Sequence, residues 1–455
     1  KQEQFYHYTA FHGRLLTTFC RVIWKNEEIF KHSQSHSFDI VTNKENELGI
    51  KMKITDLKCA IIGEHPVIRI TTDEGIDGIA AAESSKPYLK PMIMFYKDLI
   101  VGADPTDVER VMLGIRRLGS MKPWGTAVSI IEMALWDIAG KAAGVPIYKL
   151  LGGKIRDRVR VYNGNRRPQL GGVEPEHFAE AMRTMKDSPE NFSIIKQGIS
   201  FHSAMYTDVK DFYYGTPSGG STPTSPRNFY PNRGLLTQKG FNHIMKCIEA
   251  MLDVVGDDVG LALDCGPGMT AQDALKLANA VEGSNVMWLE DMITGDYTPY
   301  VLADLYLQVT PHTSTAIHTG EQIYLRQNFL ELIERNAVNI LGPDPADVGG
   351  LAEMKFIAEY ADLHGILFAP HGTLDGLLGL AAHVQLAATL PDNYIAFELP
   401  DGKPKWWYDI LNGLDELVVK DSHIKVPDTP GLGVSFKVEE AQKYLLDGET
   451  DFFDD

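Results

Sequence analysis

The segment VGLALD, residues 259–264, is the first of five short apolar runs that each end in one charged or ionisable residue. The other four are VMWLE (286–290), TAIHTGE (315–321), AVNILGPD (337–344) and GILFAPH (365–371). Each run predicts a buried strand, and a charge is costly to bury unless it is paired or bound to a metal. A charge at the same end of five successive strands therefore predicts a functional site.

Strands and helical segments alternate throughout the region that contains these runs. The candidate strands are 159–162, 192–197, 259–264, 286–290, 315–320, 337–341, 365–369 and 395–398. Helical patterns lie between them, as in 271–281 and 351–364. Such alternation indicates parallel strands joined by crossover helices. Eight units over roughly 240 residues match an α/β fold of the (β/α)8 barrel type.

The charged strand ends follow one another at intervals of roughly 23 to 31 residues, about one βα unit each. We therefore expect them to lie together on the C-terminal rim of the barrel, where barrel active sites are built. A doubly wound sheet is the alternative architecture. It offers no comparable ring for five successive strand ends.

The sequence before the barrel has a different pattern. Short strands at 53–62, 66–72 and 76–82, separated by Gly-containing turns, predict an antiparallel meander. Residues 126–144 have Ala, Leu and Ile at helical spacing, and Gly144 to Pro146 would end that helix. These elements together predict an α+β domain.

The changes of pattern divide the chain into four parts. We expect an extension or tag outside the fold at 1–51, the α+β domain at 52–155, the barrel at 156–399 and a C-terminal segment at 400–455 that packs on the α+β domain. For residues 1–51, which have no stable period, a native but poorly ordered arm is the alternative.

The composition limits the classes of partner. The 455 residues are 44% apolar and 23% charged, as in an ordinary globular enzyme, and the net charge of −18 argues against nucleic acid or an anionic membrane as partner. An anionic substrate would need a strong local cation. The four cysteines have no CxxC spacing, which argues against a zinc ribbon and fits a reducing cytoplasm. No apolar run reaches the roughly 18 residues that span a bilayer.

One long insertion follows the second candidate strand. Residues 200–234 are rich in Gly, Ser, Pro and aromatic residues. Because long loops in compact domains are often lids, we interpret this one as a lid that carries Tyr213, Tyr214, Tyr230 and Arg227. A surface insertion without a role is the alternative.

The first three strand ends supply only carboxylates. Asp264, Glu290 and Glu321 form an oxygen ligand set that suits Mg²⁺, or Mn²⁺, better than Zn²⁺. Mg²⁺ usually keeps positions open, and a substrate carboxylate could fill them. The metal would then stabilise the charge that develops when the adjacent carbon loses its proton.

The last two strand ends predict an acid–base pair. His371 is the candidate base, and Asp344 would orient its ring and raise its basicity. Taken singly, a strand-end Asp is more often a helix cap and a lone His is usually structural. Five such residues in the correct order and spacing favour a site.

Other polar residues are weaker candidates. Lys196 could neutralise the substrate carboxylate or form a rim salt bridge, and Glu398 could be an acid or a hydrogen-bond partner. His318 could face the substrate or be a hydrogen-bonded scaffold residue. Asn165 and Arg166, after the first barrel strand, are candidate substrate-binding residues. Asp291, Asp347 and Asp375 are expected to be loop or supporting residues.

Several motifs resemble those of the enolase superfamily, in the mandelate racemase branch that includes the acid-sugar dehydratases. The segment AVSIIEMALWDIAGKAAGVPIYKLLG (127–152) resembles the capping-domain signature of that branch. LALD, WLED and TGEQ resemble its three metal-ligand motifs, PDPADVGG its Pro-Asp to Gly-Gly element, and APHG its catalytic histidine motif. The resemblance implies a (β/α)7β barrel with an α+β capping domain that the C-terminal tail completes. It also implies Mg²⁺ with a Lys or His base, and a homo-oligomer.

The chain departs from this pattern in two places. Racemases of this branch have a second base two residues after the first Lys of strand two, and here that position is Gly198. One base favours elimination over two-base racemisation. Some dehydratases have a His two residues after the first metal ligand, where this chain has Gly266. A Tyr or His of the lid could substitute.

The leading hypothesis is therefore a Mg²⁺-dependent dehydratase of a sugar acid, an aldonate or aldarate. Removal of the proton alpha to the carboxylate would give an enediolate, and loss of the β-hydroxyl would give a 2-keto-3-deoxy acid. A cycloisomerase or epimerase on the same site is the alternative. A third possibility is a non-catalytic binding protein that retains the fold.

Overall fold

The computed structural model describes residues 52–84, 86–117, 125–164, 170–214, 235–293, 302–372, 376–399, 406–414 and 418–454. These residues belong to one compact unit, which spans 52–455. The segment 1–51, predicted to be an extension, lies outside the described residues. Among the described helices, none has the length and apolar content that crossing a bilayer requires.

The N-terminal part begins with an antiparallel sheet of three strands in the order β1 (Ile54–Ile62), β2 (His65–Thr72) and β3 (Gly78–Ala81). This confirms the predicted meander. Gly63 turns β1 into β2 with φ at +62°, and a Cβ at this position would lie 2.4 Å from the Trp406 ring. The turn therefore requires glycine both for its backbone conformation and for its space.

A long buried helix packs on this sheet. The helices of this part are α3 (Lys90–Met94), α4 (Lys97–Ile100), α5 (Val108–Arg117), α6 (Gly125–Ala143) and α7 (Ile147–Leu150). Of the 19 residues of α6, 15 are buried, as expected for a helix that is apolar on nearly all sides. It approaches β3 so closely that a Cβ at Gly78 would lie 2.0 Å from the Ala134 carbonyl oxygen.

The central part is a parallel sheet, as the alternating pattern predicts. Its six strands, in spatial order, are β10 (Leu367–Phe368), β9 (Ile340–Leu341), β8 (Ile317–Thr319), β7 (Val286–Glu290), β6 (Gly260–Asp264) and β5 (Ile194–Gly198). Two further strands, β4 (Arg158–Tyr162) and β11 (Phe397–Glu398), pair in parallel with each other. Isolated parallel bridges join Asn163 to Ile195 and Phe368 to Tyr394, so β4 neighbours β5 and β10 neighbours the segment before β11.

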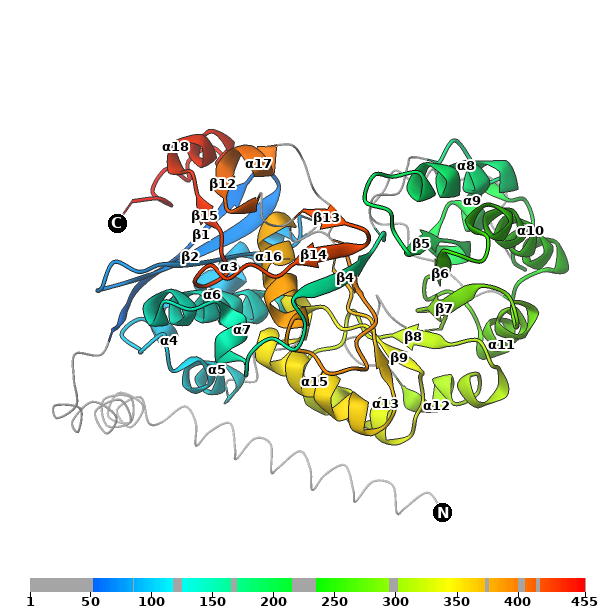
Figure 1. The fold of residues 1–455 in the computed structure, drawn as a ribbon, viewed down its shortest axis with the longest axis horizontal. Coiled ribbons are helices and arrows are strands. Elements are labelled where there is room, and N and C mark those ends of the chain that lie inside the picture. Colours follow the sequence, from blue (N-terminus) through cyan, green and yellow to red (C-terminus); the bar gives the residue numbers. More distant parts are fainter. Residues whose placement is uncertain are drawn as a thin grey trace, which may run out of the picture. The chain divides into compact units, whose positions relative to one another are not determined.

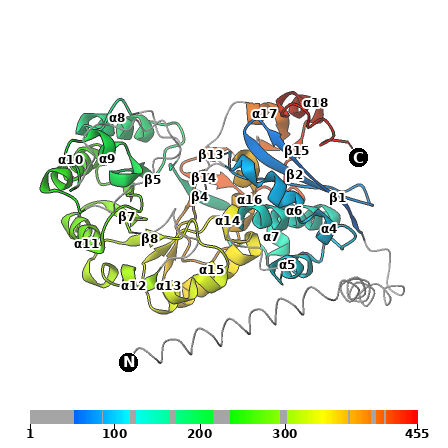
Figure 2. The same cartoon turned by 180° about the vertical axis from the view of Figure 1, so that it is seen from behind.

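Helices follow the parallel strands in the chain. They are α8 (Pro175–Lys186), α9 (Met205–Asp208), α10 (Gln238–Val255), α11 (Ala271–Ala280), α12 (Ala303–Tyr306), α13 (Leu330–Glu334), α14 (Pro345–Val348), α15 (Leu351–Leu363) and α16 (Gly376–Ala387). The short 3-10 helices are η1 (Pro87–Leu89), η2 (Ser200–His202), η3 (Thr310–His312), η4 (Arg326–Asn328) and η6 (Gln442–Tyr444). In Figures 1 and 2, α8, α10 and α11 lie on the outer side of β5, β6 and β7. The start of the insertion, treated as irregular in the sequence, contains η2 and α9.

A small core lies among the parallel strands. Single residues from most of the strands, or from the positions next to them, form a cluster that consists of Tyr162, Ile194, Ala262, Trp288, Ile340, Ala369 and Ala396. The rings of Tyr162 and Trp288 meet edge to face at 5.4 Å. The cluster forms a floor for the polar strand-end residues, because its Tyr162 and Trp288 donate hydrogen bonds to Glu398 and Glu290.

The C-terminal tail divides its contacts between the two parts. It contains α17 (Trp406–Ile410), β12 (Leu411–Asn412), β13 (Val419–Lys420), β14 (His423–Lys425), β15 (Ser435–Phe436) and α18 (Val438–Ala441). The β13–β14 hairpin pairs with β4. Further along, the Leu446 amide donates to the Ile61 carbonyl at 3.0 Å and the Gly63 amide to the Tyr444 carbonyl at 2.8 Å, so the last part of the tail lies against β1.

Candidate active site

Six carboxylate groups gather at the C-terminal ends of the parallel strands. All of them are buried, and they belong to Asp264, Glu290, Asp291, Glu321, Asp344 and Glu398. Asp264 and Glu290 end β6 and β7 and are direct partners in the strand register. Glu321 follows β8 by two residues, and Glu398 ends β11. Parallel strands bring their carboxyl ends to one edge, which is why residues so distant in sequence meet.

One buried ammonium group lies among these carboxylates. The Nζ atom of Lys196, on β5, is 2.7 Å from Glu290 Oε1, 3.0 Å from Glu398 Oε2 and 3.8 Å from Asp264 Oδ2. Burial opposes the charged form, but the negative charges of Glu290 and Glu398 outweigh it and raise the pKa of Lys196 well above its usual value. Lys196 is therefore a permanent cation inside the site.

The carboxylates can approach a single ion. Glu290, Asp291 and Glu321 each offer one oxygen, and these three atoms lie within 4.8 Å of one another. Asp264 is outside this trio, although the strand register keeps it next to Glu290. Asp291 takes φ at +49°, and the Thr319 hydroxyl donates to its Oδ1 at 2.5 Å. The oxygen-only donor set fits Mg²⁺ or Mn²⁺.

The charges of this site do not balance. Within the described part of the chain, the six buried carboxylates face one lysine, Lys196, and three histidines, His202, His318 and His371. Buried charge of one sign is costly unless a counter-charge compensates it. An excess of negative charge among the described residues is the arrangement that a cation site would have.

His371 contacts its predicted partner, Asp344, and lies near two other carboxylates of the site. Its Nδ1 lies 2.8 Å from Asp344 Oδ2, and its Nε2 lies 3.1 Å from Glu321 Oε2 and 3.7 Å from Glu398 Oε2. Burial favours the neutral ring, but the hydrogen bond with Asp344 and the charge of Glu398 outweigh it and raise the pKa of His371 to about 10. Asp344 thus orients the ring through Nδ1, and Nε2 points at the carboxylates of Glu321 and Glu398.

Asp344 has its own fixed position. It is the N-cap of α14, where its Oδ1 accepts from the Ala346 amide at 2.7 Å, and its Oδ2 faces His371. Burial favours the protonated form, but the hydrogen bond and charge of His371 lower the pKa of Asp344. An ionised Asp344 accepts only, so His371 carries the hydrogen on Nδ1 and the lone pair of a neutral ring is on Nε2.

His318 lies below the carboxylates, in the floor of the site. Its ring stacks on Trp288 with centroids 5.5 Å apart, and its Nε2 lies 3.1 Å from the Ala369 carbonyl oxygen. Burial lowers the pKa of His318, more than the charge of Glu290 raises it. Its Nδ1 lies 3.5 Å from Glu290 Oε2, so the ring contacts a predicted metal ligand as well as the scaffold.

Glu398 is in the centre of the group. Its Oε2 contacts Lys196, lies 3.4 Å from the Tyr162 hydroxyl and faces His371. Four other predicted residues lie outside the described ones, namely Asn165, Arg166, Arg227 and Tyr230. Of the two predicted lid tyrosines that are described, Tyr213 is buried and Tyr214 is exposed.

The sequence analysis did not predict the specific contacts of three neighbours of the site, although it expected Asp291 to be a loop or supporting residue and allowed a His of the lid to act there. Asp291 adds an oxygen, the Trp288 indole donates to Glu290 Oε2 at 3.0 Å, and His202 Nδ1 lies 2.6 Å from Asp264 Oδ1. Asp291 adjoins a predicted ligand, and Trp288 precedes it by two positions on one face of a strand. His202 reaches the site from a loop, for which no strand periodicity gives a signal.

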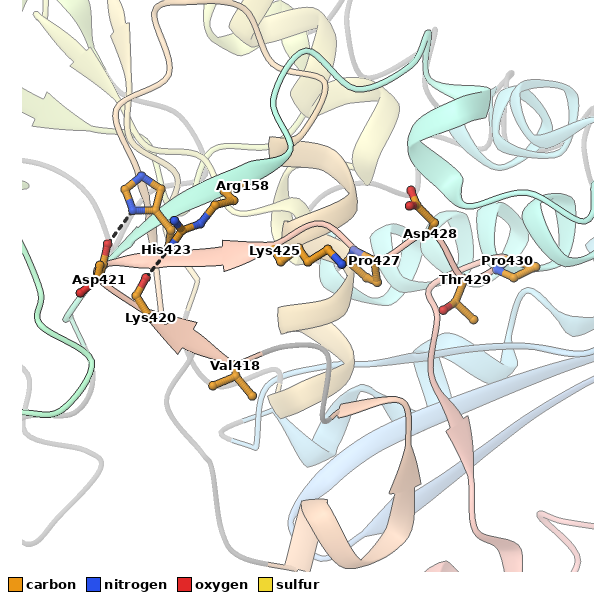
Figure 3. A pocket seen from close by; sticks show the side chains of 10 residues that line it. All are labelled: Arg158, Val418, Lys420, Asp421, His423, Lys425, Pro427, Asp428, Thr429 and Pro430. Atoms are coloured by element: carbon orange, nitrogen blue, oxygen red, sulfur yellow. Dashed lines mark hydrogen bonds between the residues drawn. The ribbon is translucent and has the colours of Figure 1, made fainter.

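A separate surface depression, with a volume of about 950 Å³, lies on the β13–β14 hairpin and the segment after it (Figure 3). Its lining includes Arg158, Lys420, His423 and Lys425, and none of the predicted site residues. Arg158 is the first residue of β4, so the depression is at the opposite end of that strand from Tyr162. It is a different feature from the carboxylate site.

Comparison with protein families matches both parts of the chain. A model described as mandelate racemase / muconate lactonizing enzyme, N-terminal domain, matches residues 41–152, and one described as enolase C-terminal domain-like matches residues 233–441. Among curated proteins, a D-xylonate dehydratase from Haloferax volcanii is 30% identical over 418 residues, 88% of this chain and 90% of that protein. A D-mannonate dehydratase from Caulobacter vibrioides is 28% identical over 86% of this chain and 95% of that protein.

Solved structures show the same relationship. The crystal structure of a mandelate racemase/muconate lactonizing enzyme-like protein from Rubrobacter xylanophilus is 27% identical, with a TM-score of 0.72. The match covers 88% of this chain and 99% of that one.

Proposed function

Because the chain belongs to the mandelate racemase / muconate lactonizing enzyme family of the enolase superfamily, we propose that it is a Mg²⁺-dependent dehydratase of a sugar acid. The substrate would be an aldonate or aldarate, and the product a 2-keto-3-deoxy acid. The names of its relatives, which include dehydratases of D-xylonate and D-mannonate, support this reaction type. A capping domain and a barrel domain are the family's architecture.

We also propose a detailed architecture, with a closed barrel and defined domain bounds. The parallel pairing of β11 with β4, and the bridges on either side of this pair, support a closed (β/α)7β barrel. The capping domain would be 52–155, completed by the tail at 400–455, and the barrel 156–399. The hairpin that the tail adds to β4 means that the tail also contacts the barrel.

The metal would be held by Asp264, Glu290 and Glu321, with Asp291 beside them. The support is the oxygen-only donor set and the excess of buried negative charge. When bound, the divalent cation would supply Lewis acidity that polarises the substrate carboxylate and acidifies the adjacent C–H bond. Lys196 would add a second positive charge next to that carboxylate.

A cation bound to the carboxylates would offset the negative charge that raises the pKa of His371. The neutral ring would then take the proton from the carbon alpha to the carboxylate through Nε2. Asp344, hydrogen-bonded to Nδ1, would hold the required tautomer and stabilise the imidazolium that forms. The electron pair of the broken C–H bond would then form the new C=C bond as the β-hydroxyl leaves. The imidazolium of His371 would return its proton to that hydroxyl, so that water is released and the enol tautomerises to the 2-keto acid.

The observation that carries this proposal is the position of His371 Nε2. It faces Glu321 at 3.1 Å while Nδ1 is held by Asp344, so the ring directs Nε2 at the carboxylates that would hold the metal, where the substrate carboxylate would bind. At the position where racemases of this family have a second base, this chain has Gly198, which cannot accept a proton. A single base is the arrangement that elimination needs.

The test is a screen of aldonates and aldarates with Mg²⁺, read out as formation of a 2-keto-3-deoxy acid. We expect turnover of at least one sugar acid, and loss of turnover in His371→Asn with Mg²⁺ binding retained. No dehydration across a broad library would contradict the proposal. Exchange of the alpha proton with solvent deuterium without loss of water would instead favour the cycloisomerase or epimerase.

A further inference from the structure

One carboxylate of the site is contacted by a side chain from outside the strands. His202, the last residue of η2, places Nδ1 2.6 Å from Asp264 Oδ1. The His202 side chain is 40% exposed and that of Asp264 is 4% exposed, so the imidazole reaches the buried carboxylate from the solvent side. An ionised carboxylate can only accept a hydrogen bond, and Nδ1 must therefore be the donor.

The backbone around His202 is fixed against the strand that carries Asp264. The Ile199 amide donates to the Asp264 carbonyl at 2.8 Å, and the amides of Phe201 and His202 both donate to the Cys265 carbonyl, at 3.0 and 3.1 Å. Ser200 adopts φ at +51°, an unusual conformation for a residue with a Cβ. Three hydrogen bonds thus hold a strained turn whose last residue is His202.

Two glycines make room for this turn. Gly266 has φ at +66°, and a Cβ there would lie 2.7 Å from the His202 backbone nitrogen and 3.1 Å from its Cβ. A Cβ at Gly268 would lie 2.2 Å from the Phe201 ring. A side chain at position 266 and the observed position of His202 therefore exclude each other.

Two other carboxylates of the site, Glu290 and Asp291, show the same arrangement. Glu290 receives a hydrogen bond from the Trp288 indole on Oε2 while its Oε1 faces Lys196, and Asp291 receives one from Thr319. Asp264 is held on Oδ1 by His202, and its Oδ2 faces Lys196 at 3.8 Å. In each case a donor from the protein fixes one oxygen of the carboxylate, which sets the direction of the group. Partners that orient ligating carboxylates in this way typically change metal affinity by roughly 10- to 100-fold.

We propose that His202 is a positioning residue for the metal. Its contact with Oδ1 fixes the direction of the Asp264 carboxylate, which would be one of the groups that hold the metal, and Gly266 leaves the space that this position of His202 needs. The inference rests on the proposed function, because it assumes that Asp264 is a ligand. It assigns a role to the beginning of the insertion, from which the sequence analysis had allowed a Tyr or His to act in place of the histidine absent at position 266.

The test is a titration with Mn²⁺ in the absence of substrate, with free Mn²⁺ measured by electron paramagnetic resonance. For His202→Leu we expect roughly 10- to 100-fold weaker binding than in wild type. For His202→Asn we expect affinity within about threefold of wild type, since the asparagine amide nitrogen is as many bonds from Cα as Nδ1 and can make the same donor contact. Gly266→Ala should resemble His202→Leu because its Cβ displaces the turn.

The matched control is His312→Leu, which changes an exposed histidine of η3 and should bind as wild type does. Wild-type affinity in His202→Leu would overturn the inference, and so would equally weak binding in His202→Asn and His202→Leu. If His202→Leu does not fold, Gly266→Ala decides in the same way, and its wild-type affinity would overturn the inference.

The proposed function is tested separately in the same series by Glu290→Gln. Loss of Mn²⁺ binding in Glu290→Gln, with unchanged binding in His202→Leu, would overturn the role of His202 and leave the metal site standing. Absence of Mn²⁺ binding by the wild-type protein would overturn both.

Discussion

Two buried charge clusters in this molecule are built from similar residues but differ in balance. The rim cluster consists of Lys196 and His371 with the six carboxylates at the strand ends. The second, here called the clasp, consists of Glu83, Lys86, Thr126 and Asp347. In the clasp, Lys86 Nζ lies 3.0 Å from both oxygens of Asp347, 3.1 Å from Glu83 Oε1 and 3.3 Å from the Thr126 hydroxyl.

The clasp joins the loop after β3 and the start of α6 to α14, which follows the strand end that carries Asp344. Its single lysine contacts both of its carboxylates, and the Thr126 hydroxyl also donates to Asp347. Burial raises the pKa of Asp347 to about 6, although the charge of Lys86 opposes this shift. The clasp has one negative charge in excess at most, and the rim has several. We infer that the clasp serves the fold and the rim serves a ligand.

The largest expected effect is the loss of turnover in Asp344→Asn. The amide would offer a hydrogen to Nδ1, so His371 would hold its own hydrogen on Nε2 and could not accept the substrate proton. Changes of this type in Asp–His pairs lower turnover by about 10⁴-fold. Steady-state kinetics on the substrate found in the screen would measure this. Because asparagine can still cap α14 through Oδ1, thermal stability and Mg²⁺ affinity should stay near wild type, and a loss of all three would contradict this role.

The clasp should show the opposite behaviour. Lys86→Met leaves Asp347 and Glu83 buried without a cation, which should lower the free energy of unfolding by about 3 kcal/mol. Mg²⁺ affinity should stay within about threefold of wild type. The matched control is Lys97→Met, which removes a surface pair with Asp56 at 2.5 Å, where we expect a change below about 1 kcal/mol. Equal effects of the two lysines in chemical denaturation would contradict the distinction between the clusters.

A third prediction concerns His383 of α16, which lies behind the Asp344–His371 pair. Burial lowers the pKa of His383 to about 4, although the charge of Asp344 opposes this shift. Its folded pKa is below the unfolded value of about 6.5, so the unfolded state takes up the proton first and stability is lost as the pH falls from about 6.5 towards 4. The loss should reach about 2 kcal/mol at pH 5.

Denaturation of wild type and His383→Leu at pH 7.5 and pH 5 measures this term. The wild-type protein should lose about 2 kcal/mol more than the variant between the two pH values. Equal losses of stability in wild type and His383→Leu would show that His383 does not contribute to the pH dependence. The negative charge of the rim cluster would then hold the pKa of His383 near its unfolded value.

The smallest expected effect is a gain of stability in Asp291→Asn. Asparagine tolerates a positive φ as well as aspartate does, and the substitution removes one charge from the excess. We expect the metal-free protein to gain about 1 kcal/mol and Mg²⁺ to bind more weakly. A loss of stability in the metal-free variant would indicate that the carboxylates are already compensated without an ion.

The sequence was most informative for strands and turns, whose side-chain patterns repeat over a few residues. Five apolar runs ending in Asp264, Glu290, Glu321, Asp344 and His371 predicted parallel strands, and the structure contains those strands in that spatial order. The register of parallel neighbours then determines which residues share an edge. The meander at 53–82 was equally accessible, because alternation and Gly-containing turns are local signals.

The contacts that the sequence did not predict depend on tertiary distance. His202 contacts Asp264 across 62 positions, and Lys86 contacts Asp347 across 261. The sequence separation of these two pairs does not distinguish their members from charged residues on the surface. Similarly, the pairing of the C-terminal hairpin with β4 depends on a free strand edge that only the folded chain presents.

The most direct test of the central claim, that the excess buried charge of the rim holds a divalent cation, is the melting temperature as a function of Mg²⁺ concentration. We expect a saturable rise in wild type and in Lys86→Met, and no rise in Glu290→Gln, because a ligand that binds only the folded state stabilises it. No shift in wild type, or an equal shift in Glu290→Gln, would contradict the claim.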